Sequence, residues 1–290
     1  MATTILSGFG TGLSYVLASL ILLFIYRLIH DRITPFDDRE QLKWGNAAAA
    51  VNRSAAYLGV MLAASGSLIK SDRPSYGDGL MMFMIDGLLA IVVFTAATYA
   101  FDWIIVRHVN NTKLIAEGNL AVAVLEACSY MSLGIIVSAS FSGSGQELLP
   151  GLLSAVLFSA VGVVTLVVIY AAYCAFWRLA LGCDIDNRVG QGSLPAAFDA
   201  GLLLLAMSVT LWFSISGDFS GWGTDLLSYA ISLAQCTLVV PAGRVLTALV
   251  LTWRLTHSSR GVYHENLAVS LTVGLVGIGI GFITGINAYI

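Results

Sequence analysis

Charge is scarce in this sequence. Only 11% of its 290 residues are Asp, Glu, Lys or Arg, whereas 58% are hydrophobic. Soluble globular domains carry about 25% charged residues and about 45–50% apolar residues. This composition excludes an ordinary soluble protein, and it also excludes a disordered chain, which requires low hydrophobicity. The mean hydropathy of +0.85 favours a membrane protein.

Cysteine and the sequence motifs of common enzymes are also lacking. The four cysteines show no CxxC spacing, and we interpret them as small hydrophobic side chains and one loop thiol. The sequence contains no Walker A, GxSxG or HExxH motif. We therefore expect no enzyme, no ATP-driven pump, no bound metal and no cofactor. Because no basic patch is present, we also expect no nucleic-acid partner.

Long apolar runs take up most of the chain. A membrane-spanning helix needs about 20 apolar residues, and the runs lack the apolar–polar alternation of barrel strands. We predict an all-α polytopic membrane protein with eight transmembrane helices in a lipid bilayer. The runs are Ile5–Ile29, Ala47–Ile69, Leu80–Val106, Asn119–Ser138, Leu152–Trp177, Pro195–Ile215, Leu226–Leu251 and Leu267–Ile286.

Basic residues are distributed unevenly among the connections between these helices. Ten of the 14 Lys and Arg residues follow the first, third, fifth and seventh helices, and the opposite side carries only Lys70 and Arg73. Cytoplasmic connections are enriched in Lys and Arg. We therefore predict that the four basic connections are cytoplasmic and that both termini lie outside, in the periplasm of a bacterial inner membrane.

The chain repeats itself after 147 residues. The motif Asn-Leu-Ala-Val opens the fourth helix at Asn119 and the eighth helix at Asn266. Each half contains four helices, so both halves enter the membrane in the same orientation. We predict two parallel four-helix transmembrane repeats, covering residues 1–147 and 148–290.

A shorter period of 73–74 residues is visible inside each half. A polar residue opens each shorter, outward-running helix, and Asn and Ser are favoured helix N-caps because the side-chain oxygen accepts a first-turn N–H. The predicted caps are Asn46, Asn119, Ser193 and Asn266. The repeating unit is therefore a hairpin made of a longer inward helix, a basic connection, a cap and a shorter outward helix.

Small residues recur at every fourth position on two of the shorter helices. Such residues allow the close backbone packing that holds helices together in lipid. We predict that the shorter helices pack together at the centre of the bundle. The alternative is that these stripes join two copies into a homo-oligomer. The stripes are Ala55, Gly59 and Ala63, and Gly277, Gly281 and Gly285.

Polar and ionisable residues within the apolar runs form the candidate site. Insertion of a charged residue at mid-helix costs about 2.5–3.5 kcal/mol, so such residues normally pair or face water. Counted from the caps at about 1.5 Å per residue, one layer lies roughly 10 Å from the cytoplasmic end. This layer comprises Asn52, Arg53, Glu126, Asp199 and Arg244. We predict that its charges pair with one another, either as a structural lock between the halves or as an ion or proton path. Asp86, in the outer half, is expected to form a separate polar point.

The connection 31–43 is the most charged stretch of the chain. It is either a solvated, orientation-setting loop or a docking site for a cytosolic protein. Its segment Thr34–Asp38, followed by Gly45–Ala50, resembles the YjfL-like bacterial inner-membrane family, a domain of unknown function. The second half departs from this pattern, with Ser193 in place of Asn and a shortened acidic segment 184–186. The resemblance implies a duplicated four-helix domain, a setting in membrane stress and no established activity.

These observations support two functions. The leading prediction is an inner-membrane channel or transporter for a small ion or polar solute, working in envelope homeostasis. The alternative is a membrane scaffold whose cytosolic connections recruit a stress-response protein or an enzyme.

Overall fold

The computed structural model describes residues 2–33, 38–69, 75–105, 111–143, 148–217, 221–252 and 266–289. Over these ranges the chain forms α-helices and one 3-10 turn, with no strand. Eight of the described helices are long and apolar enough to cross a membrane. The predicted all-α fold with eight transmembrane helices is confirmed.

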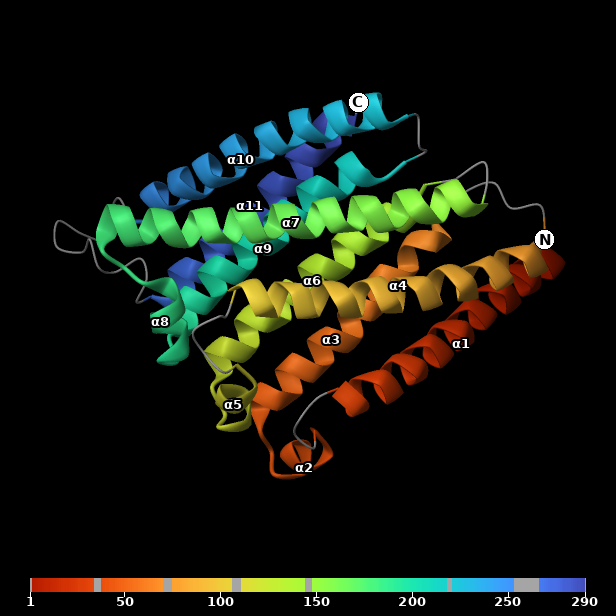
Figure 1. The fold of residues 1–290 in the computed structure, drawn as a ribbon, viewed down its shortest axis with the longest axis horizontal. Coiled ribbons are helices and arrows are strands. Elements are labelled where there is room, and N and C mark those ends of the chain that lie inside the picture. Colours follow the sequence, from red (N-terminus) through yellow and green to blue (C-terminus); the bar gives the residue numbers. More distant parts are fainter. Residues whose placement is uncertain are drawn as a thin grey trace.

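Four long helices run in one direction through the bundle, and four shorter helices return (Figure 1). The long helices have 30–34 residues, more than the about 20 that a bilayer requires. They are α1 (Ala2–Ile33), α4 (Tyr76–Ile105), α7 (Leu148–Leu181) and α10 (Trp222–Thr252). The shorter helices are α3 (Ala47–Ser65, continued by a 3-10 turn over Gly66–Leu68), α6 (Leu120–Phe141), α9 (Leu194–Ile215) and α11 (Leu267–Tyr289).

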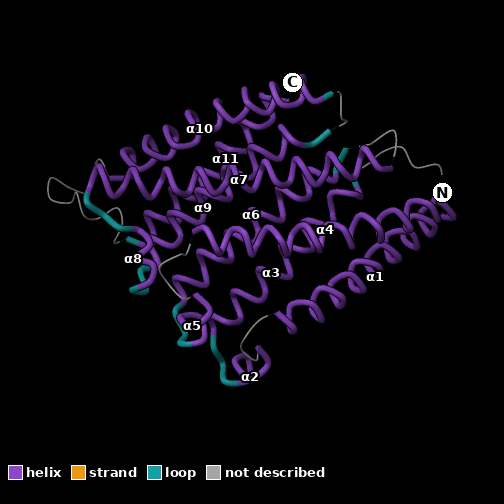
Figure 2. The backbone as a smooth tube through the Cα atoms, in the orientation of Figure 1, coloured by secondary structure: helices purple, strands orange, loops and turns teal. Residues whose placement is uncertain are grey.

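A six-residue helix precedes each of the first three shorter helices, where the sequence indicated only a connection. These helices are α2 (Asp38–Lys43), α5 (Asn111–Ala116) and α8 (Ile185–Gly190). Figure 2 shows them together at one end of the bundle, away from the end where both termini lie.

One turn geometry ends all three short helices. Gly45, Gly118 and Gly192 follow them with φ values of 75°, 88° and 91°, which a residue with a Cβ adopts only at a cost. The residue after each glycine donates its N–H to a carbonyl five residues earlier, as from Asn119 to Leu114 at 2.8 Å. This is a Schellman motif, and its last residue is also the N-cap of the next spanning helix.

The shorter helices pack side by side in the order α3, α6, α9, α11. An ideal Cβ on Gly59 would lie 2.8 Å from the carbonyl oxygen of Tyr130, and one on Gly201 would lie 2.7 Å from the Cβ of Cys128. The backbones therefore meet closely at these glycines, as small residues in membrane helices allow. The middle helices α6 and α9 are the most buried of the eight, whereas α11 lies at the edge of the row.

The long helices lie against this row, on its near side in Figure 1. Helix α4 contacts α3 and α6, α7 contacts α6 and α9, and α10 contacts α9 and α11. Their outward faces expose large apolar side chains such as Val164 and Leu238. A soluble monomer rarely exposes apolar surface on this scale, so these faces are the ones that lipid covers.

Candidate functional site

The five residues of the predicted polar layer are all buried, but they do not form one cluster. The structure distributes them among three groups, each centred on one charged side chain of a shorter helix. Asp199 and Arg244 form the first group together, Arg53 belongs to the second, and Asn52 and Glu126 belong to the third. The predicted cross-pairing is therefore present for one pair of opposite charges.

The first group is an ion pair between α9 and α10. The Nη2 atom of Arg244 donates to the carboxylate of Asp199 and, at 2.8 Å, to the backbone carbonyl of Asp199. The hydroxyl of Tyr173 on α7 donates to the other carboxylate oxygen. The side chains of Asp199 and Arg244 are only 1% and 6% exposed. This group therefore joins three helices and compensates both of its charges.

A glycine of α11 makes room for this ion pair. An ideal Cβ on Gly277 would lie 3.0 Å from Cγ of Arg244. Gly277 belongs to the predicted stripe, whose other members Gly281 and Gly285 face α9. The stripe therefore serves packing within the chain in this structure.

The second group corrects the predicted partner of Arg53. Its Nη2 atom lies 2.6 Å from a carboxylate oxygen of Asp31 on α1, and its Nε donates to the hydroxyl of Tyr57 at 2.6 Å. Arg53 was expected to pair with a carboxylate of the layer. The sequence assigned Asp31 to the connection 31–43, but α1 continues to Ile33 and carries Asp31 to the Arg53 side chain.

The third group surrounds the carboxyl of Glu126 with neutral partners. The amide nitrogen of Asn52 donates to Oε2 of Glu126, and the hydroxyl of Tyr130 lies 3.4 Å from the same oxygen. The side chain of Asn111 on α5 also faces this carboxyl, and its Oδ1 is buried with no hydrogen-bond partner among the described residues. None of the ion pairs among the described residues includes Glu126.

The second and third groups occupy one register of the hairpin repeat. Arg53 and Glu126 both lie seven residues after their cap asparagines, and Tyr57 and Tyr130 both lie eleven residues after them. In each hairpin the tyrosine hydroxyl contacts the charged side chain one helical turn before it. Arg53 and Glu126 therefore occupy equivalent positions in their hairpins but carry opposite charges.

Asp86, the predicted second polar point, is buried on α4 with 4% of its surface exposed. It lies ten residues from the start of α4 at Tyr76 and nineteen from its end at Ile105. Its depth therefore places it in the half of the bundle away from α2, α5 and α8.

Two cap asparagines bind two helices each. The Oδ1 atom of Asn46 accepts the N–H of Ala49 at 3.2 Å, and its Nδ2 donates to the carbonyl of Ile115 in α5 at 2.9 Å. Asn119 repeats this arrangement one hairpin later, since its Nδ2 donates to the carbonyl of Gly190 in α8 at 2.8 Å. Each asparagine therefore caps its own helix and fixes the short helix of the next hairpin.

The remaining two predicted caps differ from each other. Asn266 caps α11, and its Oδ1 accepts the N–H of Ala268 at 3.0 Å. Ser193 occupies the N-cap position of α9, but its side chain makes no capping hydrogen bond, which corrects the prediction for this residue. Pro195 is the second residue of α9, so one of the N–H groups that a cap usually binds is missing.

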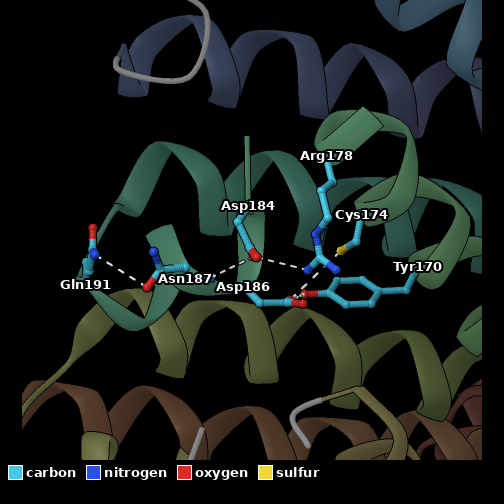
Figure 3. Close-up of polar contacts among 7 residues, drawn as sticks. All are labelled: Tyr170, Cys174, Arg178, Asp184, Asp186, Asn187 and Gln191. Atoms are coloured by element: carbon cyan, nitrogen blue, oxygen red, sulfur yellow. Dashed lines mark hydrogen bonds and ion pairs between the residues drawn. The ribbon is translucent and has the colours of Figure 1, made fainter. Parts of the chain in front are cut away.

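A further polar cluster, which the sequence analysis missed, fixes α8 to α7 (Figure 3). The hydroxyl of Tyr170 donates to Asp186 at 2.6 Å, and the thiol of Cys174 lies 3.9 Å from the same oxygen. One turn further, Arg178 pairs with Asp184 at 2.9 Å. The spacing of four between the three residues of α7 is a signal that could have indicated this shared face.

The structure offers few ligands for a metal ion or a cofactor. Within the described ranges, no group of three or more His, Cys, Asp or Glu side chains gathers. The four cysteines are free and buried. Three of the four histidines, at positions 108, 257 and 264, lie outside the described residues.

A family model described as Domain of Unknown Function (DUF350) matches this chain twice, over residues 4–141 and 75–207. The chain belongs to the DUF350 family. The two matches begin 71 residues apart, so the family pattern fits the chain again after a shift of about one hairpin. The division into units 1–147 and 148–290 stays a prediction.

One curated relative is the UPF0719 transmembrane protein of Aquifex aeolicus strain VF5. It is 28% identical over 199 residues, which cover 68% of this chain and 72% of the relative. No solved structure matches the chain. The resemblance to an uncharacterised family of multi-pass membrane proteins is thereby confirmed.

Proposed function

We propose that this DUF350 protein moves a small cation, such as a proton, across the membrane, and that the carboxyl of Glu126 is the group that binds it. The single observation that carries the proposal is that Glu126 is buried and that its hydrogen-bond partners among the described residues are all neutral. A buried carboxylate without a cation is costly. Ionisable residues inside membrane proteins are rare, and those that occur commonly have a function.

The comparison with Asp199 separates a structural carboxylate from a working one. Asp199 is held by Arg244 and Tyr173, so binding of a cation there requires an ion pair to break. Glu126 accepts hydrogen bonds from an amide and a hydroxyl, so it can take up or release a cation without that loss. We therefore assign cation binding to Glu126 and a structural role, which holds the helices together, to the ion pair of Asp199 and Arg244.

A flux measurement on purified protein in liposomes tests the proposal. With proton, sodium and potassium gradients applied in turn, we expect flux above empty liposomes for the native chain and its loss in Glu126→Gln. The matched control is Glu117→Gln, because Glu117 is an exposed carboxyl whose loss should leave flux unchanged. Equal flux in native protein and Glu126→Gln would refute the assignment.

A membrane scaffold is the second candidate. It is favoured by Trp44, which follows α2 and is 77% exposed at the end of the bundle where the short helices gather. The connection 31–43 beside it is the proposed docking segment for a cytosolic protein, although residues 34–37 lie outside the described ranges. Absence of flux for all three cations, with Glu126→Gln only less stable, would favour this candidate.

The proposed cellular setting follows from charge and from the resemblance. The end carrying α2, α5 and α8 is proposed to be cytoplasmic because most Lys and Arg residues flank it, which leaves both termini outside. Several of those basic residues, including Arg107, Arg254 and Arg260, lie outside the described residues. A bacterial inner membrane, a role in envelope homeostasis, membership of the YjfL-like branch and the absence of an enzymatic reaction remain parts of this proposal.

A further inference from the structure

The row of shorter helices is built from one junction used three times. Counted from each cap, the ninth residue of one helix meets the eighth residue of the next in two of the three junctions. In α6 and α9 these are Cys128 and Gly201, and in α9 and α11 they are Leu202 and Gly274. Further along, the thirteenth residue of one helix meets the fifteenth of the next, as Gly59 of α3 meets Gly134 of α6 and Ala206 of α9 meets Gly281 of α11. The family match that recurs after 71 residues agrees with such a repeated junction.

Helix α11 presents the same face, and no described residue packs on it. Its ninth, thirteenth and seventeenth residues are Leu275, Gly279 and Ile283. Leu275 is 59% exposed and Ile283 is 62% exposed. An ideal Cβ on Gly279 would meet no atom within 4 Å. This free face of α11 repeats the register with which α3, α6 and α9 each receive the next helix.

The opposite edge of the row is α3 with its preceding short helix α2, and it also has an exposed apolar position. Ile115 of α5 and Val189 of α8, each four residues before a cap, are 2% and 3% exposed. Leu42 is the equivalent residue of α2, and it is 43% exposed. Helices α5 and α8 contact α3 and α6 of the preceding hairpins at this position, whereas Leu42 of α2 stays exposed among the described residues.

The cap asparagines provide a third observation that the two edges of the row are complementary. Asn46 and Asn119 use Oδ1 for their own helix and Nδ2 for the short helix of the next hairpin. Asn266 uses Oδ1 to cap α11, and its Nδ2 has no hydrogen bond among the described residues. The carbonyl that corresponds to the acceptor Ile115 belongs to Leu42 of α2.

We propose that a second copy of this chain places its α2–α3 edge on the free face of α11, head to tail. The occupant is a second copy because the two free edges are the two halves of the junction already used three times inside the chain. Met61, fifteenth after its cap, then faces Gly279 where the inner junctions have small residues, so a flexible thioether fills the glycine notch. A head-to-tail contact uses two different surfaces and yields rings or open chains. This proposal does not rest on the proposed cation path.

Disulfide trapping in membranes of cells that make the full chain tests this contact. The pair Ser54→Cys with Leu275→Cys places cysteines at the eighth residue of α3 and the ninth of α11. These positions are equivalent to Gly201 and Cys128, which are in contact within the chain. Oxidation is expected to give a reductant-sensitive ladder of dimers and larger species. The matched control replaces Leu275→Cys by Leu238→Cys on the lipid-facing side of α10, and it is expected to stay monomeric. A second pair, Ser65→Cys with Ile286→Cys, samples the outer end of the same junction.

Three outcomes overturn the proposal. If Leu275→Cys alone forms dimers, α11 packs against α11 of its partner and the contact is symmetric. If both designed pairs remain monomeric while the native chain stays folded, lipid covers the face. If the α10 control crosslinks as strongly as the designed pairs, the trapping reports random collision. A ladder from either designed pair, without self-linking of the single variants, supports the head-to-tail contact.

Discussion

The buried ion pair between Asp199 and Arg244 gives the sharpest test of how this bundle is held together. Replacing one partner, by Asp199→Asn or Arg244→Gln, leaves the other charge on a side chain that is at most 6% exposed. Loss of one partner of a buried pair costs about 3–5 kcal/mol. Removal of both charges leaves no uncompensated ion, so the double variant is expected to be more stable than either single variant.

The measurement is the free energy of unfolding in mild detergent for the native chain, the two single variants and the double variant. An exposed pair provides the control, because Lys113 and Glu117 are 70% and 57% exposed and lie 3.7 Å apart. Breaking that pair is expected to cost less than about 1 kcal/mol. If the Asp199 and Arg244 single variants lose as little as this control, or if their losses add in the double variant, the pair is not the lock described here.

Two further comparisons test the repeated packing and the caps. On α11, Gly281→Ala is expected to destabilise the monomer by about 1–3 kcal/mol because its Cβ would overlap the carbonyl of Ala206, whereas Gly279→Ala, two residues earlier, should change the unfolding free energy little. A thermal melt that shifts equally for both variants would contradict the described packing. At the caps, Asn119→Ala is expected to cost about 1–2 kcal/mol, and Ser193→Ala less than about 0.5 kcal/mol because that serine makes no capping bond. Equal losses at the two caps in chemical unfolding would contradict this difference.

The predicted site illustrates how far a count along a helix can reach. Position after the cap gives depth in the membrane, because each residue adds about 1.5 Å. Counting from Asn46 therefore gives Asn52 and Arg53 nearly the same depth. Neighbouring residues of a helix point about 100° apart, so Asn52 faces α6 and Glu126 while Arg53 faces α1 and Asp31. The depth of a residue does not tell in which direction around the helix its side chain points.

The sequence by itself determined the eight spanning helices, their alternation of long and short, and the hairpin repeat. Lipid leaves backbone groups no partner except within a helix, so length and apolar composition are sufficient for that assignment. The recurrence of Asn46 and Asn119 likewise marked the helix starts, since an N-cap is a local interaction. Such features depend on residues close together in the chain.

Only the tertiary structure decided which polar groups meet. The partner of Arg53 is 22 residues away on another helix, and Arg244 meets Asp199 across 45 residues. The six-residue helices α2, α5 and α8 were also invisible in the sequence, because they are too short for a periodic pattern. In addition, α5 and α8 accept hydrogen bonds from the cap asparagines of the preceding hairpins. These contacts depend on how the helices rotate and pack, and composition and spacing along one chain do not specify either.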